Sequence, residues 1–227
     1  TLQKINDALE LGEGETASEI YDRSKENAEP NLEMFIHVTK DGFGAMGHVD
    51  ICYKGRIISF GNYDTNSERL FGAMGDGVLF SADREKYIEF CKRENHKTLL
   101  GYGLALSPEQ LAAVDKEIAK LMSLTVPWDP PKTVKPKRPG IDKEEPMYAY
   151  KLKQEADGRL YKFTSSKFKT YFVMSTNCVL LADTIVGAAG TDILSVRGFI
   201  SPGTYQDYLD KEFERPHSLV VTKRVYQ

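Results

Sequence analysis

The distribution of apolar residues along the chain predicts a mixture of strands and helices. The clearest strand pair is "HVDICYKGRIISFGNYD" (48–64), in which two runs rich in β-branched and aromatic residues flank Lys54 and Gly55. A two-residue turn there places Asp50 opposite Ser59 on the paired strand. Alternation of side chains then predicts one face of the hairpin made of His48, Asp50, Cys52, Ile57, Ser59 and Gly61.

Helical spacing is strongest in "SPEQLAAVDKEIAKLMSL" (107–124), which has a Ser cap and a Pro at the first helical position. Another helix is expected to begin near Ser81 and to bury Tyr87, Phe90 and Cys91. The other elements expected are strands at 34–40, 99–106 and 217–226, and a second hairpin over 147–166.

The segment "YFVMSTNCVLLADTIVG" (171–187) changes from extended to helical composition and carries a cysteine at the change. Ser175 and Thr176 are both good N-cap residues. The pattern therefore predicts that Cys178 lies in the first turn of a helix that ends at Gly187.

Length and composition indicate one large domain with an N-terminal extension. The chain has 227 residues, of which 41% are apolar, enough for a substantial core. Residues 1–30 are polar and predict a helical extension, and 31–227 form the domain. Residues 126–146 hold six of the ten prolines and predict an irregular surface loop with few core contacts. Trp128 within it is expected to anchor the loop, and the alternative is an aromatic wall for a ligand.

Charge and hydropathy exclude some classes of partner. The 30 basic and 33 acidic residues give a net charge of −3, without the basic surplus typical of nucleic-acid binding. No apolar run approaches the roughly 20 residues of a membrane-spanning helix. The chain begins with Thr1 instead of Met; the sequence leaves the location open, and an extracytoplasmic or membrane-associated location is favoured if a targeting or anchoring segment was removed.

The cysteines and histidines are few and scattered in sequence. Three cysteines (Cys52, Cys91 and Cys178) do not make a disulfide framework, and no pair has the close spacing of a zinc site. We therefore expect no metal and no cofactor. His37, His96 and His217 are each expected to have ordinary structural or surface roles.

One cysteine and one histidine could together form a catalytic dyad. A helix N-terminus favours the thiolate form of cysteine, and a neighbouring imidazole favours it further. Cys178 has the first condition, and His48, at the start of a well-defined strand, could supply the second. The imidazole also needs an orienting partner, for which Ser59 is the best candidate. Asn62 takes this role if the turn is one residue longer, whereas Asp50 reaches the ring only with difficulty.

A family resemblance supports this combination. The stretch "GHVDICYKGRIISFG", followed much later by "STNCVLLADTIV", resembles the circularly permuted branch of the NlpC-type, papain-like cysteine hydrolases. Papain-like enzymes ordinarily place Cys before His, whereas the permuted branch places His first, as here. The resemblance covers 44–64 and 168–187, under a quarter of the chain. It implies that His48 and Cys178 are the family's dyad and that its third residue falls at or near Ser59, where a Ser departs from the usual His, Glu, Asn or Gln.

This branch includes bacterial peptidases and amidases and is similar to lecithin:retinol acyltransferase. The resemblance implies an α+β papain-like domain with a small antiparallel sheet packed against the nucleophile helix. It also implies thiol-dependent hydrolysis of an amide or peptide bond, with a peptide, for example from a cell wall, or an acylated small molecule as substrate. Two alternatives stay open: a lipid or acyl-group transferase on the same dyad, and a non-catalytic binding domain that retains the fold.

Overall fold

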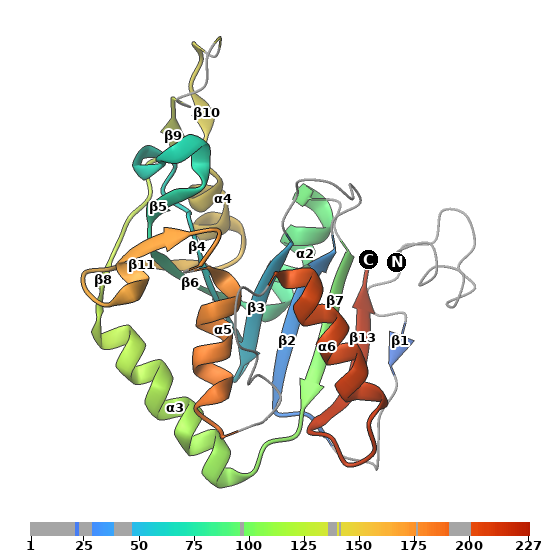
Figure 1. Cartoon of the computed structure of the whole chain (residues 1–227). Coiled ribbons are helices and arrows are strands. Elements are labelled where there is room, and N and C mark those ends of the chain that lie inside the picture. The colour runs from blue at the N-terminus through green and yellow to red at the C-terminus, as the bar shows by residue number, and fades with distance from the viewer. Residues whose placement is uncertain are drawn as a thin grey trace, which may run out of the picture.

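The structure, a computed structural model, describes residues 21–22, 29–38, 47–95, 98–135, 140, 142–175, 177–190 and 201–227. These residues form an α+β fold around one large antiparallel sheet (Figure 1). Its nine strands run in the order β1 (Tyr21–Asp22), β13 (Val220–Tyr226), β7 (Thr98–Leu104), β2 (Leu32–Val38), β3 (His48–Tyr53), β4 (Arg56–Gly61), β6 (Val78–Asp83), β11 (Arg159–Phe163) and β8 (Thr125–Pro127). The mixed α+β class is as expected, but the expectation of a small sheet is wrong, because strands from distant parts of the chain extend the central hairpin on both sides.

The central hairpin β3–β4 has the predicted register. Lys54 and Gly55 both have positive φ, 50° and 72°, as a two-residue turn of the primed type requires. Cys52 pairs with Ile57, so the side chains alternate between the two faces of the sheet as the pattern predicts.

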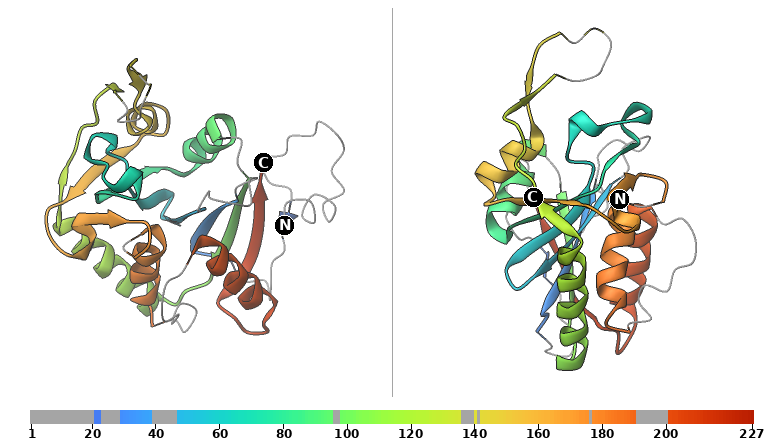
Figure 2. Two further views of the ribbon diagram at one scale, coloured as in Figure 1. Left: turned by 45° about the horizontal axis from the view of Figure 1, so that its top comes forward. Right: turned by 90° about the vertical axis from the view of Figure 1, so that its left-hand side faces the viewer.

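Helices cover both faces of the sheet (Figure 2). On one face α3 (Pro108–Ser123), α5 (Cys178–Gly187) and α6 (Pro202–Glu214) bury apolar side chains against Met34, Ile36, Val49 and Ile51. On the other face α2 (Arg84–Asn95) and α4 (Tyr148–Glu155) pack against Phe35, Cys52 and Ile57. Odd and even positions of β2 and β3 thus enter different cores, which explains why these strands are apolar on both sides.

Helix α3 begins as predicted. Ser107 accepts a hydrogen bond from the backbone N–H of Gln110, and the Gln110 side chain accepts one from the backbone N–H of Ser107, which completes a capping box. The helix expected near Ser81 begins only at Arg84, because β6 continues to Asp83.

The expected second hairpin over 147–166 is wrong in its first half. Residues 148–155 form α4, since Ala149 and Leu152 lie three positions apart and are both buried. The second half is β11, which pairs with β6 and β8 instead of with a hairpin partner.

The proline-rich segment 126–146 is less irregular than expected in its described residues. It continues β8 and contains a two-stranded ladder of β9 (Thr133–Val134) and β10 (Glu145–Pro146). Val134 is buried, and Trp128 packs against the core beneath α2 and α4, so the anchoring role expected of Trp128 fits its position.

Most of the predicted N-terminal helical extension, 1–20 and 23–28, lies outside the described residues. The described Tyr21–Asp22 pair with β13 as strand β1 and are not helical. No helix in the described part of the chain is long and apolar enough to cross a membrane.

Asp183 on α5 offers a test of how this helix is packed. It is half-buried, and burial raises its pKa to about 6. An unfolded Asp has a pKa of about 3.9. Above about pH 6 the carboxylate is ionised in both states, and its burial destabilises the folded state. Below about pH 4 it is protonated in both states, so this penalty disappears. Asp183→Asn should therefore raise the melting temperature at about pH 7.5 and have little effect at about pH 4.

The measurement is thermal unfolding followed by circular dichroism at both pH values. Asp142→Asn is the matched control, because the Asp142 side chain is 98% exposed. An equal effect of Asp183→Asn at the two pH values would show that the helix does not bury this carboxylate.

Candidate functional site

The site lies at one end of the central strands, where β2 and β4 end and β3 begins. His37 of β2 pairs directly with His48 of β3. A pocket of about 460 Å³ opens here, lined by His37, His48, Gly61, Asn62, Tyr63, Glu68, Gly72, Tyr87, Tyr148, Tyr171 and Val173. Because the sheet ends at this point, side chains from either face can meet.

Helix α5 points its N-terminus toward the same end, and Asn177 fixes its start. The Asn177 Oδ1 accepts a hydrogen bond of 3.1 Å from the Leu180 N–H, and its Nδ2 donates one of 3.1 Å to the carbonyl of Val173. Asn177, instead of Ser175 or Thr176, is therefore the N-cap. Cys178 is the first helical residue, within the predicted first turn.

The structure brings the two residues of the predicted dyad together. The Cys178 sulfur lies close enough to the His48 imidazole to help raise its pKa, although the two residues lie 130 positions apart in the sequence. Cys178 is buried, with 3% exposure, and is not itself a lining residue of the pocket. His48 lines the pocket and keeps 22% of its side chain exposed, so it lies between the thiol and the pocket's polar groups.

Ser59 and Asp50 hold the Nε2 side of the His48 ring, and Tyr63 Oη lies 3.4 Å from the same nitrogen. Nε2 is 2.6 Å from Ser59 Oγ, in hydrogen-bond geometry, and 2.6 Å from Asp50 Oδ1, as a close ion pair rather than an aligned hydrogen bond. Ser59 Oγ is in turn 2.7 Å from Tyr63 Oη. The expectation that Asp50 reaches the ring only with difficulty is wrong, because the His48 imidazole turns toward Asp50, which lies two residues further along β3.

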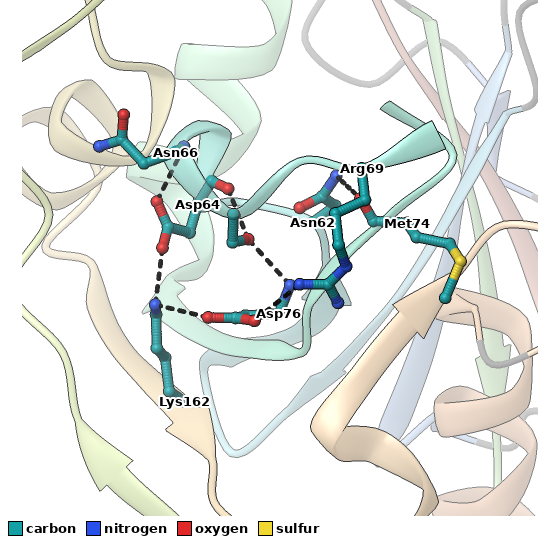
Figure 3. Close-up of polar contacts among 8 residues, drawn as sticks. Asn62, Asp64, Asn66, Arg69, Met74, Asp76 and Lys162 are labelled. Atoms are coloured by element: carbon teal, nitrogen blue, oxygen red, sulfur yellow. Dashed lines mark hydrogen bonds and ion pairs between the residues drawn. The ribbon is translucent and has the colours of Figure 1, made fainter. Parts of the chain in front are cut away.

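Asn62 does not take the alternative role of ring partner. Its Nδ2 faces the carbonyl oxygens of Gly72 and Met74, each at 3.4 Å. Asn62 therefore supports the loop beside the pocket (Figure 3).

Sequence reasoning missed two members of the site. His37 Nε2 lies 2.5 Å from Asp50 Oδ2, and Tyr87 Oη donates a hydrogen bond of 2.8 Å to the same oxygen. His37 was expected to be structural and Tyr87 to be core. Strand alternation places His37 on the face of His48 only once the pairing of β2 with β3 is established, and that pairing joins separate segments of the chain.

The electrostatics of this cluster follow from a buried carboxylate. Asp50 has no solvent exposure; burial alone raises its pKa, but His48 and His37 together hold that pKa well below its usual value. Burial by itself lowers the pKa of His48, but the Asp50 carboxylate and the Cys178 sulfur raise it to about 10. His48 is therefore an imidazolium at neutral pH, next to the thiol.

His37, His48 and Asp50 are also the one group of donors in the described residues that could hold a metal ion, since their ligand atoms lie within 4.8 Å of one another. Two imidazoles and a carboxylate suit several divalent transition metals. However, the nitrogen–oxygen separations of 2.5 and 2.6 Å are those of a proton-linked cluster. Metal bonds of about 2.0–2.2 Å in a tetrahedral site would hold the same atoms roughly 3.3 Å apart.

No family model, curated protein or solved structure matches this chain.

The dependence of His48 on Asp50 can be measured directly. In Asp50→Asn the carboxylate that raises the His48 pKa is gone while burial remains, so this pKa should fall from about 10 to near or below the ordinary value of about 6.5. The free energy of unfolding should also decrease, by about 3–5 kcal/mol, because the substitution removes one partner of a buried ion pair. The measurements are an NMR titration of the imidazole ring and chemical denaturation.

Ser59→Ala is the control for the titration, because it removes a contact to the same nitrogen and leaves the charge of Asp50 in place. A His48 pKa that stays near 10 in Asp50→Asn would contradict the assignment of Asp50 as the dominant partner.

Proposed function

We propose that this protein is a thiol-dependent hydrolase of an amide or peptide bond, with Cys178 as nucleophile and His48 as general acid–base. The observation that carries the proposal is the proximity of a thiol at a helix start to an imidazole that Asp50 and Ser59 hold on its Nε2 side. A cysteine beside a positively charged imidazole at a helix N-terminus is the environment that activates thiols.

In the proposed reaction the Cys178 sulfur attacks the substrate carbonyl carbon while its proton resides on His48. The tetrahedral intermediate collapses as His48 gives this proton to the leaving amine, which leaves a thioester on Cys178. Water then attacks the thioester; His48 takes a proton from the water and returns it to the sulfur as the carboxylic acid leaves.

The backbone N–H of Cys178 is the proposed donor to the oxyanion. In the first turn of α5 the N–H of Leu180 is used by the Asn177 cap, whereas that of Cys178 precedes it and faces the helix end. The helix dipole adds to this stabilisation of negative charge.

Asp50 has the orienting role in this proposal, with Ser59 as a second support. His37 and Tyr87 position the other carboxylate oxygen, so that Asp50 cannot turn away from His48. These two residues act through Asp50 and are positioning residues.

The resemblance to permuted papain-like hydrolases agrees with this proposal in chain order and in packing, since α5 lies against β3 and β4. A papain-like fold and a peptide substrate, such as a cell-wall peptide, belong to the proposal and rest on that resemblance. Asp50, two residues after the histidine on the same strand, takes the place that the resemblance gives to a residue at or near Ser59.

An acyl transferase on the same dyad is the second candidate, and one observation favours it. Leu70, Phe71 and Met174 are strongly exposed apolar residues, at 62%, 111% and 54%, and they adjoin the pocket residues Gly72 and Val173. An acyl donor with an apolar chain would be complementary to such a rim. Added hydroxylamine distinguishes the two, because a transferase passes the acyl group to it in preference to water.

The proposed function is tested by the reactivity of the three thiols. Iodoacetamide near neutral pH should alkylate Cys178 at least about tenfold faster than Cys52 and Cys91, because Cys178 lies beside the His48 imidazolium at a helix N-terminus. All three are buried, so burial alone does not favour Cys178. The measurement is peptide mapping by mass spectrometry at successive times.

His48→Ala should remove this preference, and Ser59→Ala should reduce it far less because Asp50 still holds the ring. Equal, slow alkylation of the three thiols in the unmodified protein would refute the nucleophile assignment and favour a non-catalytic domain.

The stability of a Cys178 variant distinguishes a loss of catalysis from a loss of folding. Cys178→Ser changes one buried atom and should alter the unfolding free energy by no more than about 1 kcal/mol, yet abolish turnover of any substrate found. Chemical denaturation of Cys178→Ser measures its unfolding free energy. A loss of several kcal/mol would instead identify Cys178 as a packing residue.

A further inference from the structure

The pocket beside His48 has an unusual charge distribution. Among the residues that the structure describes, Glu68 is the one acidic residue that lines it, and no Lys or Arg does so. The two histidines lie at the sheet end of the pocket, whereas Glu68 belongs to the loop between β4 and β5 (Met74–Asp76).

The Glu68 carboxylate has no hydrogen bond or ion pair with any residue that the structure describes, although the side chain is half-buried. Its position is indicated by Gly72, since a methyl group built there would be 3.8 Å from Glu68 Oε2. Both residues line the pocket, so the carboxylate lies at its wall, where no described residue supplies a counter-charge.

The acidic residues near Glu68, Asp64 on the same loop and Asp76 on β5, are paired with basic groups, as Figure 3 shows. Lys162 Nζ is 2.6 Å from an Asp64 oxygen and 2.9 Å from an Asp76 oxygen, and Arg69 is 3.7 Å from the other oxygen of Asp76. The nearby basic groups are thus committed to two aspartates. As far as the described residues go, Glu68 is left as the uncompensated charge on a loop that these contacts hold in shape.

Aromatic rings make up much of the remaining wall. Tyr63, Tyr87, Tyr148 and Tyr171 all line the pocket, and the rings of Tyr63 and Tyr148 are stacked with centroids 6.5 Å apart. The faces of such rings attract cations, and a carboxylate forms strong charge-assisted hydrogen bonds with ammonium groups. Neutral or anionic ligands would gain nothing from the carboxylate and would leave it unpaired.

We infer that this pocket binds a primary ammonium group of the substrate, with Glu68 as its counter-charge and the tyrosines as its walls. The inference rests on the proposed function for the other end of the substrate, whose carbonyl would lie at His48 and Cys178. The imidazolium of His48 repels a cation, so the two ends of an amine-bearing acyl donor have only one favourable orientation in the pocket.

The test uses simple probes and Cys178→Ala protein, so that binding is measured without chemistry. The probes are 4-aminobutanamide and pentanamide, which differ by an ammonium in place of a methyl group, and 4-(trimethylammonio)butanamide. Binding is followed by NMR shifts of the pocket residues. 4-Aminobutanamide should bind about tenfold tighter than pentanamide, as one partly shielded charge pair allows. The quaternary amide should fall between them, because it cannot donate hydrogen bonds to Glu68.

Glu68→Gln in the same background should abolish the preference for the ammonium probe, whereas Glu109→Gln should preserve it. Glu109 is exposed on α3 outside the pocket, so this control makes the same change in net charge.

Equal binding of the two probes, no binding of either, or a preference that survives Glu68→Gln would each overturn the inference. The quaternary amide binding tightest, even in Glu68→Gln, would assign recognition to the aromatic rings and also overturn it. Failure of the proposed function appears separately, as absence of selective Cys178 alkylation in the unmodified protein, and leaves the binding result interpretable.

Discussion

A carboxylate without any solvent exposure, Asp50, lies between two imidazoles at the end of the central sheet. A lone ionised carboxylate in such a place would cost several kcal/mol. Here each oxygen faces a different ring, from His37 and from His48, and Tyr87 donates a further hydrogen bond. The charge thus connects β2, β3 and α2, and it fixes His48, the histidine whose pKa the Cys178 thiol raises.

This constraint connects the fold to the proposed chemistry. Helix α5 packs its apolar side chains on one face of the sheet, while Asp50 belongs to the opposite face. Only at the strand end can the first residue of α5 meet an imidazole that Asp50 holds. The Asn177 cap and the position of His48 as the first residue of β3 both place their groups at that end. The polar groups of the site thereby lie at the rim of the two-sided core.

The features predictable from sequence are those encoded locally. The register of β3–β4 follows from the Lys54-Gly55 turn, α3 follows from its capping box, and Cys178 in a first helical turn follows from a break in hydrophobic pattern. The size of the sheet was not predictable, because β13 and β11 join it through contacts between distant segments. For the same reason the role of His37 was not predictable, since it depends on pairing with β3. Glu68 carries no sequence signal; its isolation is visible only once the partners of Asp64 and Asp76 are known.

The most direct test of the central claim, that Asp50 and His48 activate Cys178, is to trap the acyl-enzyme. The protein is treated with p-nitrophenyl acetate, quenched in acid and mapped by mass spectrometry for acetyl groups. We predict a transient acetyl thioester on Cys178 that is absent from His48→Ala and strongly reduced in Asp50→Asn. Acetyl groups confined to lysines, or present on Cys178 to the same extent in His48→Ala, would contradict the account.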